Sequence, residues 1–219
     1  MSAMDALSLV TVRVELRGRA LIPALDLIVR PGECVTVMGP SGCGKSTLLA
    51  FVSGTMDSAF RASGRVLIGD DDFTDCPPEK RRIGIQFQDD LLFPHLSVGG
   101  NLAFALAVGI RDKAERRGRV EAALAEAGLP GFADRDPATL SGGQRARVAL
   151  MRTLLAEPRV LLLDEPFNKL DAQLRSDFRR FVFDHAAERG LPALLVTHDA
   201  ADAEAAGGPV MQIEGAGGG

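Results

Sequence analysis

The sequence predicts an α/β fold with a largely parallel sheet, and three observations support this prediction. Short apolar runs typical of buried strands cover 34–38, 160–163 and 193–196. Helical spacing of apolar residues follows at 45–52 and again at 174–185. The chain has 219 residues, of which 46% are hydrophobic, so it can bury one sizeable core.

The run at 34–38 leads into a glycine-rich segment with the complete pattern of a phosphate-binding P-loop. Strand, loop and then helix is the context that such a loop requires. Its glycines let backbone N–H groups turn inward around a phosphate, and the helix N-terminus adds its positive dipole end. A chance glycine-rich turn is the alternative, but it does not account for the full match. The residues predicted to bind nucleotide are Gly39, Pro40, Ser41, Gly42, Cys43, Gly44, Lys45, Ser46 and Thr47.

The last residues of this loop are expected to contact phosphate and metal directly. Lys45 is expected to reach the β- and γ-phosphates of a nucleoside triphosphate as a point charge. The Ser46 hydroxyl is expected to ligate Mg²⁺, a hard ion that accepts oxygen ligands, and Thr47 to lie on the α-phosphate side. Side chains at Gly42 or Gly44 are expected to obstruct the phosphate cradle.

The run at 160–163 is predicted to be a buried parallel strand with two acids at its carboxyl end. Asp164 and Glu165 follow the run directly, and Pro166 comes next. Neighbouring strand residues point to opposite faces, so the two acids can share one site only if the strand ends there and the chain turns at Pro166. An exposed acidic turn is the alternative. We favour a site because phosphoryl transfer needs such carboxylates beside a P-loop.

The run at 193–196 delivers polar residues in the same way, with Thr197 and His198 at its end. In open α/β sheets, ligands gather at the carboxyl ends of strands, so three separate segments are predicted to meet at one crevice. A lone histidine is most often structural or simply exposed, and His198 gains a functional interpretation only from this position.

Between residues 91 and 156 the pattern changes to helices without obvious strands. Helices are predicted at 98–108, 113–127 and 142–155, which indicates an inserted helical lobe. The predicted organisation is a single domain over 1–213, with a core lobe at about 1–90 and 157–213, a helical lobe at about 91–156, and a disordered tail at 214–219.

A second diagnostic motif, Leu-Ser-Gly-Gly-Gln, occupies 140–144. With both motifs, the chain resembles the ATP-binding cassette (ABC) ATPases over 7–213, and it is most similar to the short YnjD-type and thiamine-type importer subunits. The resemblance implies a P-loop NTPase core with a mixed, mostly parallel sheet, an N-terminal antiparallel β portion and an inserted α-helical lobe. It also implies that ATP and Mg²⁺ are bound and that ATP is hydrolysed.

The resemblance implies roles for four further side chains. Asp164 would hold Mg²⁺ directly or through water, and Glu165 would polarise the attacking water. Gln88 would complete the Mg²⁺ shell, in a loop that joins the core to the helical lobe, although a glutamine after a strand is usually a surface amide. His198 would contact the γ-phosphate.

The motif at 140–144 opens a predicted helix, so a second anion site is expected at a helix N-terminus. Each chain then has one P-loop but two helix N-termini that can face a phosphate. This excess predicts a head-to-tail homodimer, in which each motif covers the γ-phosphate bound to the other chain. The residues predicted at this second site are Ser141, Gly142, Gly143, Gln144 and, by resemblance, Asp171.

Composition excludes several classes of partner and location. The net charge of -4 and the pI near 5.4 argue against a general nucleic-acid binder. Cys34, Cys43 and Cys76 have no metal-ligand spacing and indicate a reducing compartment. The longest apolar stretch, 102–110, is about half of the ~20 residues that a bilayer span needs. A membrane role must therefore come through a partner.

The importer resemblance implies which partners these are. It implies integral-membrane permease subunits, a solute-binding protein, and a location at the cytoplasmic face of the membrane. Leu91, Leu92 and Phe93 are expected either to dock a short permease helix or to pack in the core.

The sequence departs from the family pattern in several places. Relatives usually have an aromatic residue about two dozen positions before the P-loop to stack on adenine, whereas 12–18 contains none, with Leu16 among its residues. The loss of a stack is expected to relax base choice and to permit GTP hydrolysis. Asn168 and Lys169 replace the commoner small residues before Asp171, and inhibition by a C-terminal regulatory domain is not expected. Cys43 is interpreted as a tolerated small residue.

The sequence therefore predicts the ATP-hydrolysing subunit of an importer for a small solute. The alternatives are an efflux system with a separate membrane protein and a soluble ABC ATPase without transport. Chromosome-maintenance relatives need long coiled-coil arms and translation-associated relatives need two cassettes, and this chain has neither.

Overall fold

The computed structural model describes residues 5–107 and 109–213, which divide into two compact units. Within these residues, the sheet unit comprises 5–85, Arg159–Glu165 and 183–213, and the helical unit comprises 86–107, 109–158 and Pro166–Val182. Segment 166–182 groups with the helical unit, and not with the core lobe as its position in the sequence predicts. The predicted disordered tail, 214–219, lies outside the described residues.

The centre of the sheet unit is a five-stranded sheet. The apolar runs expected to be strands are β3 (Cys34–Met38), β7 (Val160–Asp164) and β8 (Ala193–Thr197). β8 lies between the other two and pairs parallel with both, and all three are buried over nearly their whole length. The predicted parallel sheet is confirmed. The outer strands are β6 (Ile83–Gln86), next to β7, and β9 (Val210–Gln212), next to β3.

The register of these parallel strands brings three chain segments to one edge of the sheet. Met38 at the end of β3 pairs with Thr197 at the end of β8. Asp164 at the end of β7 pairs with Val196. The P-loop, the two adjacent acids and His198 follow these strand ends, so the fold positions them together.

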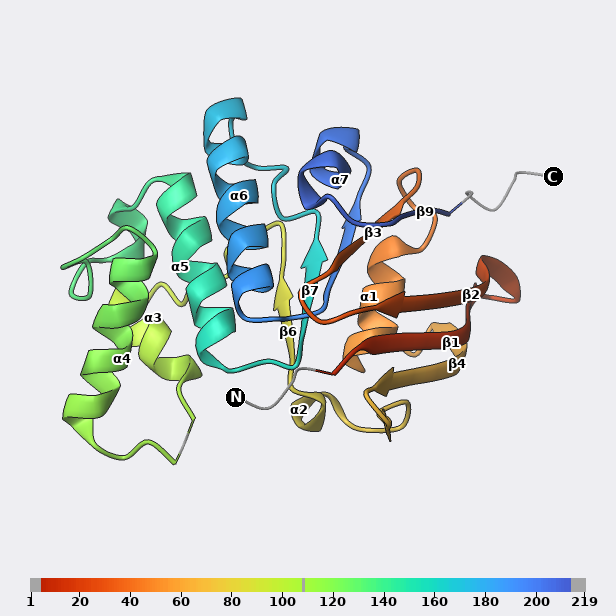
Figure 1. Cartoon of the computed structure of the whole chain (residues 1–219), viewed down its shortest axis with the longest axis horizontal. Coiled ribbons are helices and arrows are strands. Elements are labelled where there is room, and N and C mark those ends of the chain that lie inside the picture. The colour runs from red at the N-terminus through yellow and green to blue at the C-terminus, as the bar shows by residue number, and fades with distance from the viewer. Residues whose placement is uncertain (1–4, 108, 214–219) are drawn as a thin grey trace. The chain divides into compact units, whose positions relative to one another are not determined.

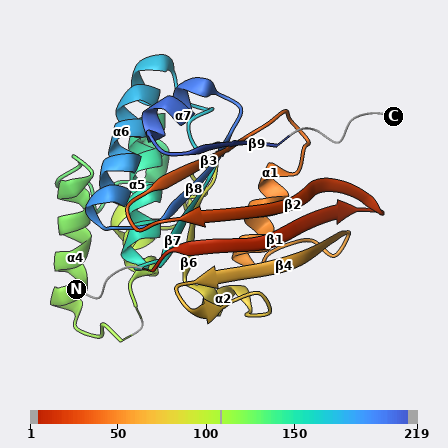
Figure 2. The ribbon, with the colours of Figure 1, turned by 45° about the vertical axis from the view of Figure 1, so that its right-hand side comes forward.

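A second, four-stranded sheet of the same unit is antiparallel, and Figure 2 shows its three long strands side by side. β1 lies between β2 and β4, and Leu16 at the end of β1 pairs with Phe60 at the start of β4. The inner faces of these strands join the apolar core with Leu48 and Val52 of the P-loop helix. The strands, in spatial order, are β2 (Arg19–Val29), β1 (Leu7–Leu16), β4 (Phe60–Ile68) and β5 (Asp71–Asp72).

Arg81 stabilises the C-terminal end of the helix that follows the P-loop. This helix, α1 (Lys45–Ser53), ends at Gly54, and the buried guanidinium of Arg81 donates to the carbonyls of Phe51 and Val52 at 2.9 and 2.8 Å. These carbonyls lie in the last turn of the helix, where intrahelical partners run out; the amide of Gly54 also donates to the Phe51 carbonyl, at 3.1 Å. The other helices of the sheet unit are α2 (Pro78–Arg81) and α7 (Ala200–Ala206).

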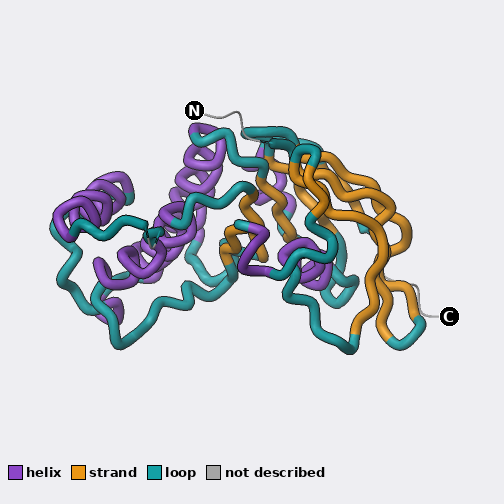
Figure 3. The backbone as a smooth tube through the Cα atoms, turned by 90° about the horizontal axis from the view of Figure 1, so that it is seen from below, coloured by secondary structure: helices purple, strands orange, loops and turns teal. Residues whose placement is uncertain are grey.

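The helical unit contains α3 (Val98–Ala105), α4 (Lys113–Glu126), the 3-10 turn η1 (Pro137–Thr139) and α5 (Gly142–Leu155). The first part of α6 (Ala172–Glu188) also belongs to it. Helices are drawn in purple and strands in orange in Figure 3, and the chain is coloured by residue number in Figure 1. Side chains next to the helices cap their N-termini. The Ser97 hydroxyl accepts from the amide of Gly100 in α3, and the Asp112 carboxylate accepts from the amide of Ala114 in α4.

One predicted helix is shorter than expected. Helix 98–108 ends at Ala105, because Leu106 adopts extended backbone and its amide bonds back to Ala103. Residue 108 lies outside the described residues. In the portion of the chain that is described, none of the helices is both long enough and apolar enough to span a bilayer.

Candidate functional site

The P-loop curves because two of its glycines adopt backbone angles that other residues avoid. Gly42 has φ 80° and Gly44 has φ 99°, and Gly44 is the N-cap of α1 without a side-chain cap. A Cβ added to Gly44 would lie 3.1 Å from the Cβ of Leu21 on β2, as expected for a crowded position. At Gly42 an added Cβ would meet no protein atom, so the positive φ is what the structure itself shows to require glycine, and obstruction of a bound phosphate stays a prediction.

Lys45 lies inside the loop, at the first residue of α1. Its side chain is 5% exposed, and its ammonium donates to the carbonyls of Gly39 at 2.8 Å and Pro40 at 2.9 Å. The charge is therefore held at the centre of the loop. Cys43 faces the other way and joins the apolar core, with 3% exposure.

The first polar pair of the site joins the P-loop helix to β7. The Ser46 hydroxyl donates to the Asp164 carboxylate, with an Oγ–Oδ1 distance of 2.9 Å. Burial raises the pKa of Asp164; the charge of Glu165 also raises it, while the hydrogen bond from Ser46 and the charge of Lys45 lower it. Hydroxyl and carboxylate oxygens that meet in this way are the ligand types that Mg²⁺ prefers.

Glu165 turns away from the strand at the position where the sequence required a turn. β7 ends at Asp164, and Glu165 itself has a left-handed φ of 45°, with its amide donating to the carbonyl of Val196 at 3.0 Å. Its carboxylate lies 3.2 Å from Nδ1 of His198. The turn thus begins one residue before Pro166 and brings the acid to the histidine at the end of β8.

A network of short hydrogen bonds holds the loop that carries His198. The hydroxyl of buried Thr197 donates to Asp202 at 2.6 Å and accepts from the amide of Asp199 at 3.0 Å. Asp199 in turn caps α7 by accepting from the amide of Ala201. His198 therefore lies in a turn that these hydrogen bonds stabilise, with about half of its side chain exposed.

A cavity of about 320 Å³ lies over the P-loop in the sheet unit. The lining divides by chemistry into a polar part with Lys45, Ser46 and Glu165, called the polar end below, and an apolar part with Leu16, Leu21 and Phe60, called the apolar end. Phe60 was not predicted from the sequence because no local motif marks it. Its only signal is an aromatic residue at the start of a strand. The remaining lining residues are Ser41, Gly42, Gly44 and Thr47.

The polar end of this cavity fits a phosphate with its metal. The uncapped N-terminus of α1, the ammonium of Lys45 and two glycines with positive φ favour an anion. The Ser46–Asp164 pair beside them favours a hard divalent cation.

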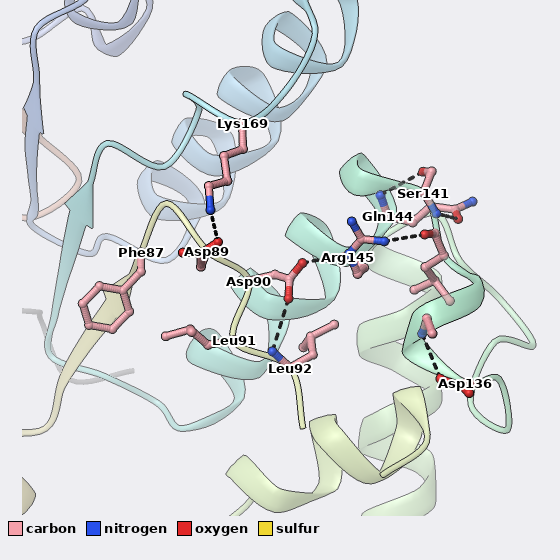
Figure 4. A network of polar contacts seen from close by, with 12 residues as sticks. Phe87, Asp89, Asp90, Leu91, Leu92, Asp136, Ser141, Gln144, Arg145 and Lys169 are labelled. Atoms are coloured by element: carbon pink, nitrogen blue, oxygen red, sulfur yellow. Dashed lines mark hydrogen bonds and ion pairs between the residues drawn. The ribbon is translucent and has the colours of Figure 1, made fainter. Parts of the chain in front are cut away.

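Gln88 belongs to the helical unit, in the loop that follows β6. With Asp89, Asp90, Arg145 and Lys169 it lines a smaller cavity of about 130 Å³ within that unit. Figure 4 shows the Lys169 ammonium directed at Asp89 and the guanidinium of Arg145 at Asp90, where the nitrogen–oxygen distance is 2.9 Å. Lys169, one of the departures from the family pattern, thus forms an ion pair with the residue after Gln88.

The motif at 140–144 begins α5 with a capping box. The amide of Gln144 donates to the Ser141 hydroxyl at 3.3 Å, and the Gln144 side chain accepts from the Ser141 amide at 2.9 Å (Figure 4). A Cβ on Gly143 would lie 3.1 Å from Leu174 of α6, so close packing accounts for this glycine. Asp171 accepts from the amide of Leu174 at 3.0 Å and starts α6.

The predicted docking patch divides between exposed and packed residues. Leu91 is 55% exposed and has a left-handed φ of 46°. The ring of Phe93 packs edge-on against Phe104 with centroids 4.9 Å apart, and Phe104 is 68% exposed. Leu92 and Phe93 are half-buried, so none of the three residues belongs to the buried core, and docking of a permease helix stays a prediction.

The predicted site residues fall into two groups. The sheet unit brings together the P-loop, Asp164, Glu165 and His198, and the helical unit contains Gln88, Asp171 and Ser141–Gln144.

Cys34, Cys43 and Cys76 are free thiols.

Comparison with known proteins gives consistent matches. A family profile described as ABC transporter matches residues 22–168. The chain is 46% identical over 194 residues to the uncharacterized ABC transporter ATP-binding protein YnjD of Escherichia coli (strain K12), covering 89% of each chain. It is 47% identical over 179 residues to the Fe(3+) ions import ATP-binding protein FbpC 1 of Rhizobium meliloti (strain 1021), covering 81% of this chain but only 50% of that protein.

A solved structure supports the fold. The dimeric structure of MJ0796, a bacterial ABC transporter cassette, superimposes with a TM-score of 0.78 at 30% sequence identity, covering 95% of this chain and 94% of that chain. This match confirms the predicted α/β cassette fold, in which the parallel strands and the antiparallel strands form two separate sheets.

Proposed function

Because the chain belongs to the ABC transporter family, we propose that it is the ATP-hydrolysing subunit of an importer and drives uptake of a small solute through separate permease subunits. The observation that carries this proposal is the convergence of the P-loop, the Ser46–Asp164 pair and Glu165 around one cavity. Anion-binding, metal-binding and water-orienting groups then lie within reach of one nucleotide.

The proposed chemistry assigns one task to each group of the sheet unit. Lys45 leaves the loop carbonyls to contact the β- and γ-phosphates, and the N-terminus of α1 binds the phosphate oxygens. Ser46 and Asp164 would hold Mg²⁺, which supplies positive charge against the phosphates as they react. Glu165 orients the attacking water, and His198 lies beside that carboxylate to contact the γ-phosphate.

The proposed assembly is a homodimer with ATP at its interface. Ser141 to Gln144 and Asp171 would complete the site of the partner chain, and Gln88 would complete the Mg²⁺ shell. The presence of two anion-facing helix starts in a chain with one P-loop supports this arrangement, as does the dimeric state of the MJ0796 cassette.

The proposed partners are membrane permease subunits and a solute-binding protein. The import function in the name of the Rhizobium relative supports uptake as the direction, although the chain spans about half the length of that relative. Leu91 and Phe104 supply exposed apolar surface suited to a permease helix, and this contact would hold the subunit at the cytoplasmic face of the membrane.

Glu165→Gln tests the proposal, because it removes the water-orienting charge and leaves the phosphate contacts in place. We expect steady-state ATP hydrolysis to fall roughly 10²- to 10⁴-fold with ATP binding retained. Tagged Glu165→Gln protein, purified with ATP from gently solubilised membranes, should carry a multi-span permease in two-to-two ratio, identified by mass spectrometry.

Glu204→Gln, an exposed glutamate of α7, is the matched control and should keep wild-type hydrolysis. Unchanged hydrolysis in Glu165→Gln would contradict the catalytic assignment. Recovery of the protein only from the soluble fraction, alone or with ribosomal or DNA-bound partners, would contradict its proposed role as an importer subunit.

A further inference from the structure

The cavity over the P-loop has an apolar end that the phosphate chemistry does not use. Leu16, Leu21 and Phe60 line this end and come from three different strands, β1, β2 and β4. Leu16 and Phe60 are direct cross-strand partners. The apolar end is continuous with the P-loop residues in one cavity of about 320 Å³, so a ligand anchored there by its phosphates has its remaining part beside these side chains.

The backbone of Phe60 is held by the turn before it and by the strand beside it. Its amide donates to the carbonyl of Asp57 at 3.1 Å, and the Asp57 carboxylate accepts from the amide of Ala59 at 2.8 Å. Its ring is half-buried against the apolar core while also lining the cavity. It is the sole aromatic group among the described residues that line this cavity.

We propose that Phe60 stacks on the base of the bound nucleotide, with Leu16 and Leu21 completing the base pocket. The inference rests on the proposed function, because it takes the phosphates to lie in the P-loop. A planar base gains from an aromatic face both by apolar burial and by stacking. Phe60 thus supplies from β4 the aromatic surface that segment 12–18, at the end of β1 and in the turn after it, lacks.

The same pocket defines the class of base that it accepts. The side chains of Leu16, Leu21 and Phe60 carry no hydrogen-bonding group, so they cannot distinguish the polar edges of adenine and guanine. Stacking strength instead favours the larger purine rings over pyrimidines. ATP and GTP are therefore expected to bind within a few-fold of each other, and more tightly than CTP or UTP.

A single tryptophan tests the contact directly, since the chain contains neither tryptophan nor tyrosine. In Phe60→Trp, ATP with Mg²⁺ should change the indole fluorescence, whereas inorganic tripolyphosphate with Mg²⁺ should bind without that change. Phe73→Trp is the matched control, because Phe73 packs against the same core but does not line the cavity, and ATP should leave its fluorescence unchanged.

Phe60→Leu separates stacking from packing, since it keeps apolar volume and removes the ring. We expect ATP affinity, measured by calorimetry, to fall roughly 2- to 12-fold and tripolyphosphate affinity to stay constant. Phe73→Leu should change neither affinity.

Two results would overturn the inference alone: ATP binding without any fluorescence change in Phe60→Trp, or an equal loss of ATP and tripolyphosphate affinity in Phe60→Leu. Failure of the unaltered chain to bind ATP would overturn the proposed function, and the inference with it.

Discussion

At the level of single residues, the site depends on side chains whose directions are set by their neighbours. The Ser46 hydroxyl meets Asp164, and Glu165 meets His198, across chain segments far apart in sequence. The P-loop residues could be predicted because their pattern is contiguous. Phe60 could not, because it reaches the cavity through cross-strand pairing with Leu16, and pairing leaves no local mark in the sequence.

Cys34 gives a pH-dependent prediction at this scale. Burial, with a smaller contribution from the charge of Glu33, raises the pKa of Cys34 from 9.0 to about 12. The native thiol therefore keeps its proton where the unfolded thiol loses it. The free energy of unfolding should be unaffected by this residue below pH 9 and should fall as pH rises from 9 toward 12, measured by urea unfolding.

Cys34→Ala should show a smaller decline over the same pH range. In the native protein at pH 8, iodoacetamide should label half-buried Cys76 and leave Cys34 unmodified until the chain unfolds. Equal labelling rates for the two thiols would contradict the protected state of Cys34.

At the level of elements, the short apolar strands were predictable and the antiparallel sheet was less so. The predicted runs at 34–38, 160–163 and 193–196 agree with β3, β7 and β8 within one residue, because strands buried on both faces read as continuous apolar runs. β1 instead shows register shifts between Leu9 and Val12 that interrupt its alternation.

Arg81 gives a prediction for the stability of α1. Its guanidinium also donates to the carbonyls of Cys76 and Thr74, so Arg81→Ala leaves four buried or half-buried carbonyls without this donor. We expect a loss of about 2–4 kcal/mol in the free energy of unfolding, measured by urea titration followed by circular dichroism.

Arg13→Ala, at an exposed position on β1, is the matched control and should change the free energy of unfolding by less than about 0.5 kcal/mol. Similar losses in the free energy of unfolding for the two variants would show that the Arg81 hydrogen bonds do not stabilise α1.

At the level of the whole molecule, the candidate residues are shared between two compact units, each with its own hydrogen-bond network. Motif spacing predicted which residues belong together chemically. Pairing between Lys169 and Asp89 was not predictable, since both lie in loops and only the fold of the helical unit brings them together.

The proposed dimer gives a prediction at this scale. Glu165→Gln with ATP and Mg²⁺ should double in mass by light scattering, because the nucleotide is retained at the interface. Adding Ser141→Arg should prevent this doubling, since a long cation would replace the helix cap that the proposed dimer places against the partner.

Ala125→Arg, added at an exposed position of α4 instead, should leave the ATP-dependent dimer intact. A constant monomer mass in Glu165→Gln with saturating ATP would exclude the head-to-tail assembly.

The left-handed backbone of Glu165 has a consequence for protein engineering. A residue other than glycine held at φ 45° carries roughly 1–2 kcal/mol of strain. Glycine or asparagine at this position would relieve that strain and discard the carboxylate. Laboratory evolution for heat resistance alone would therefore select variants without the carboxylate proposed to orient the attacking water, and such a screen needs a simultaneous assay of turnover.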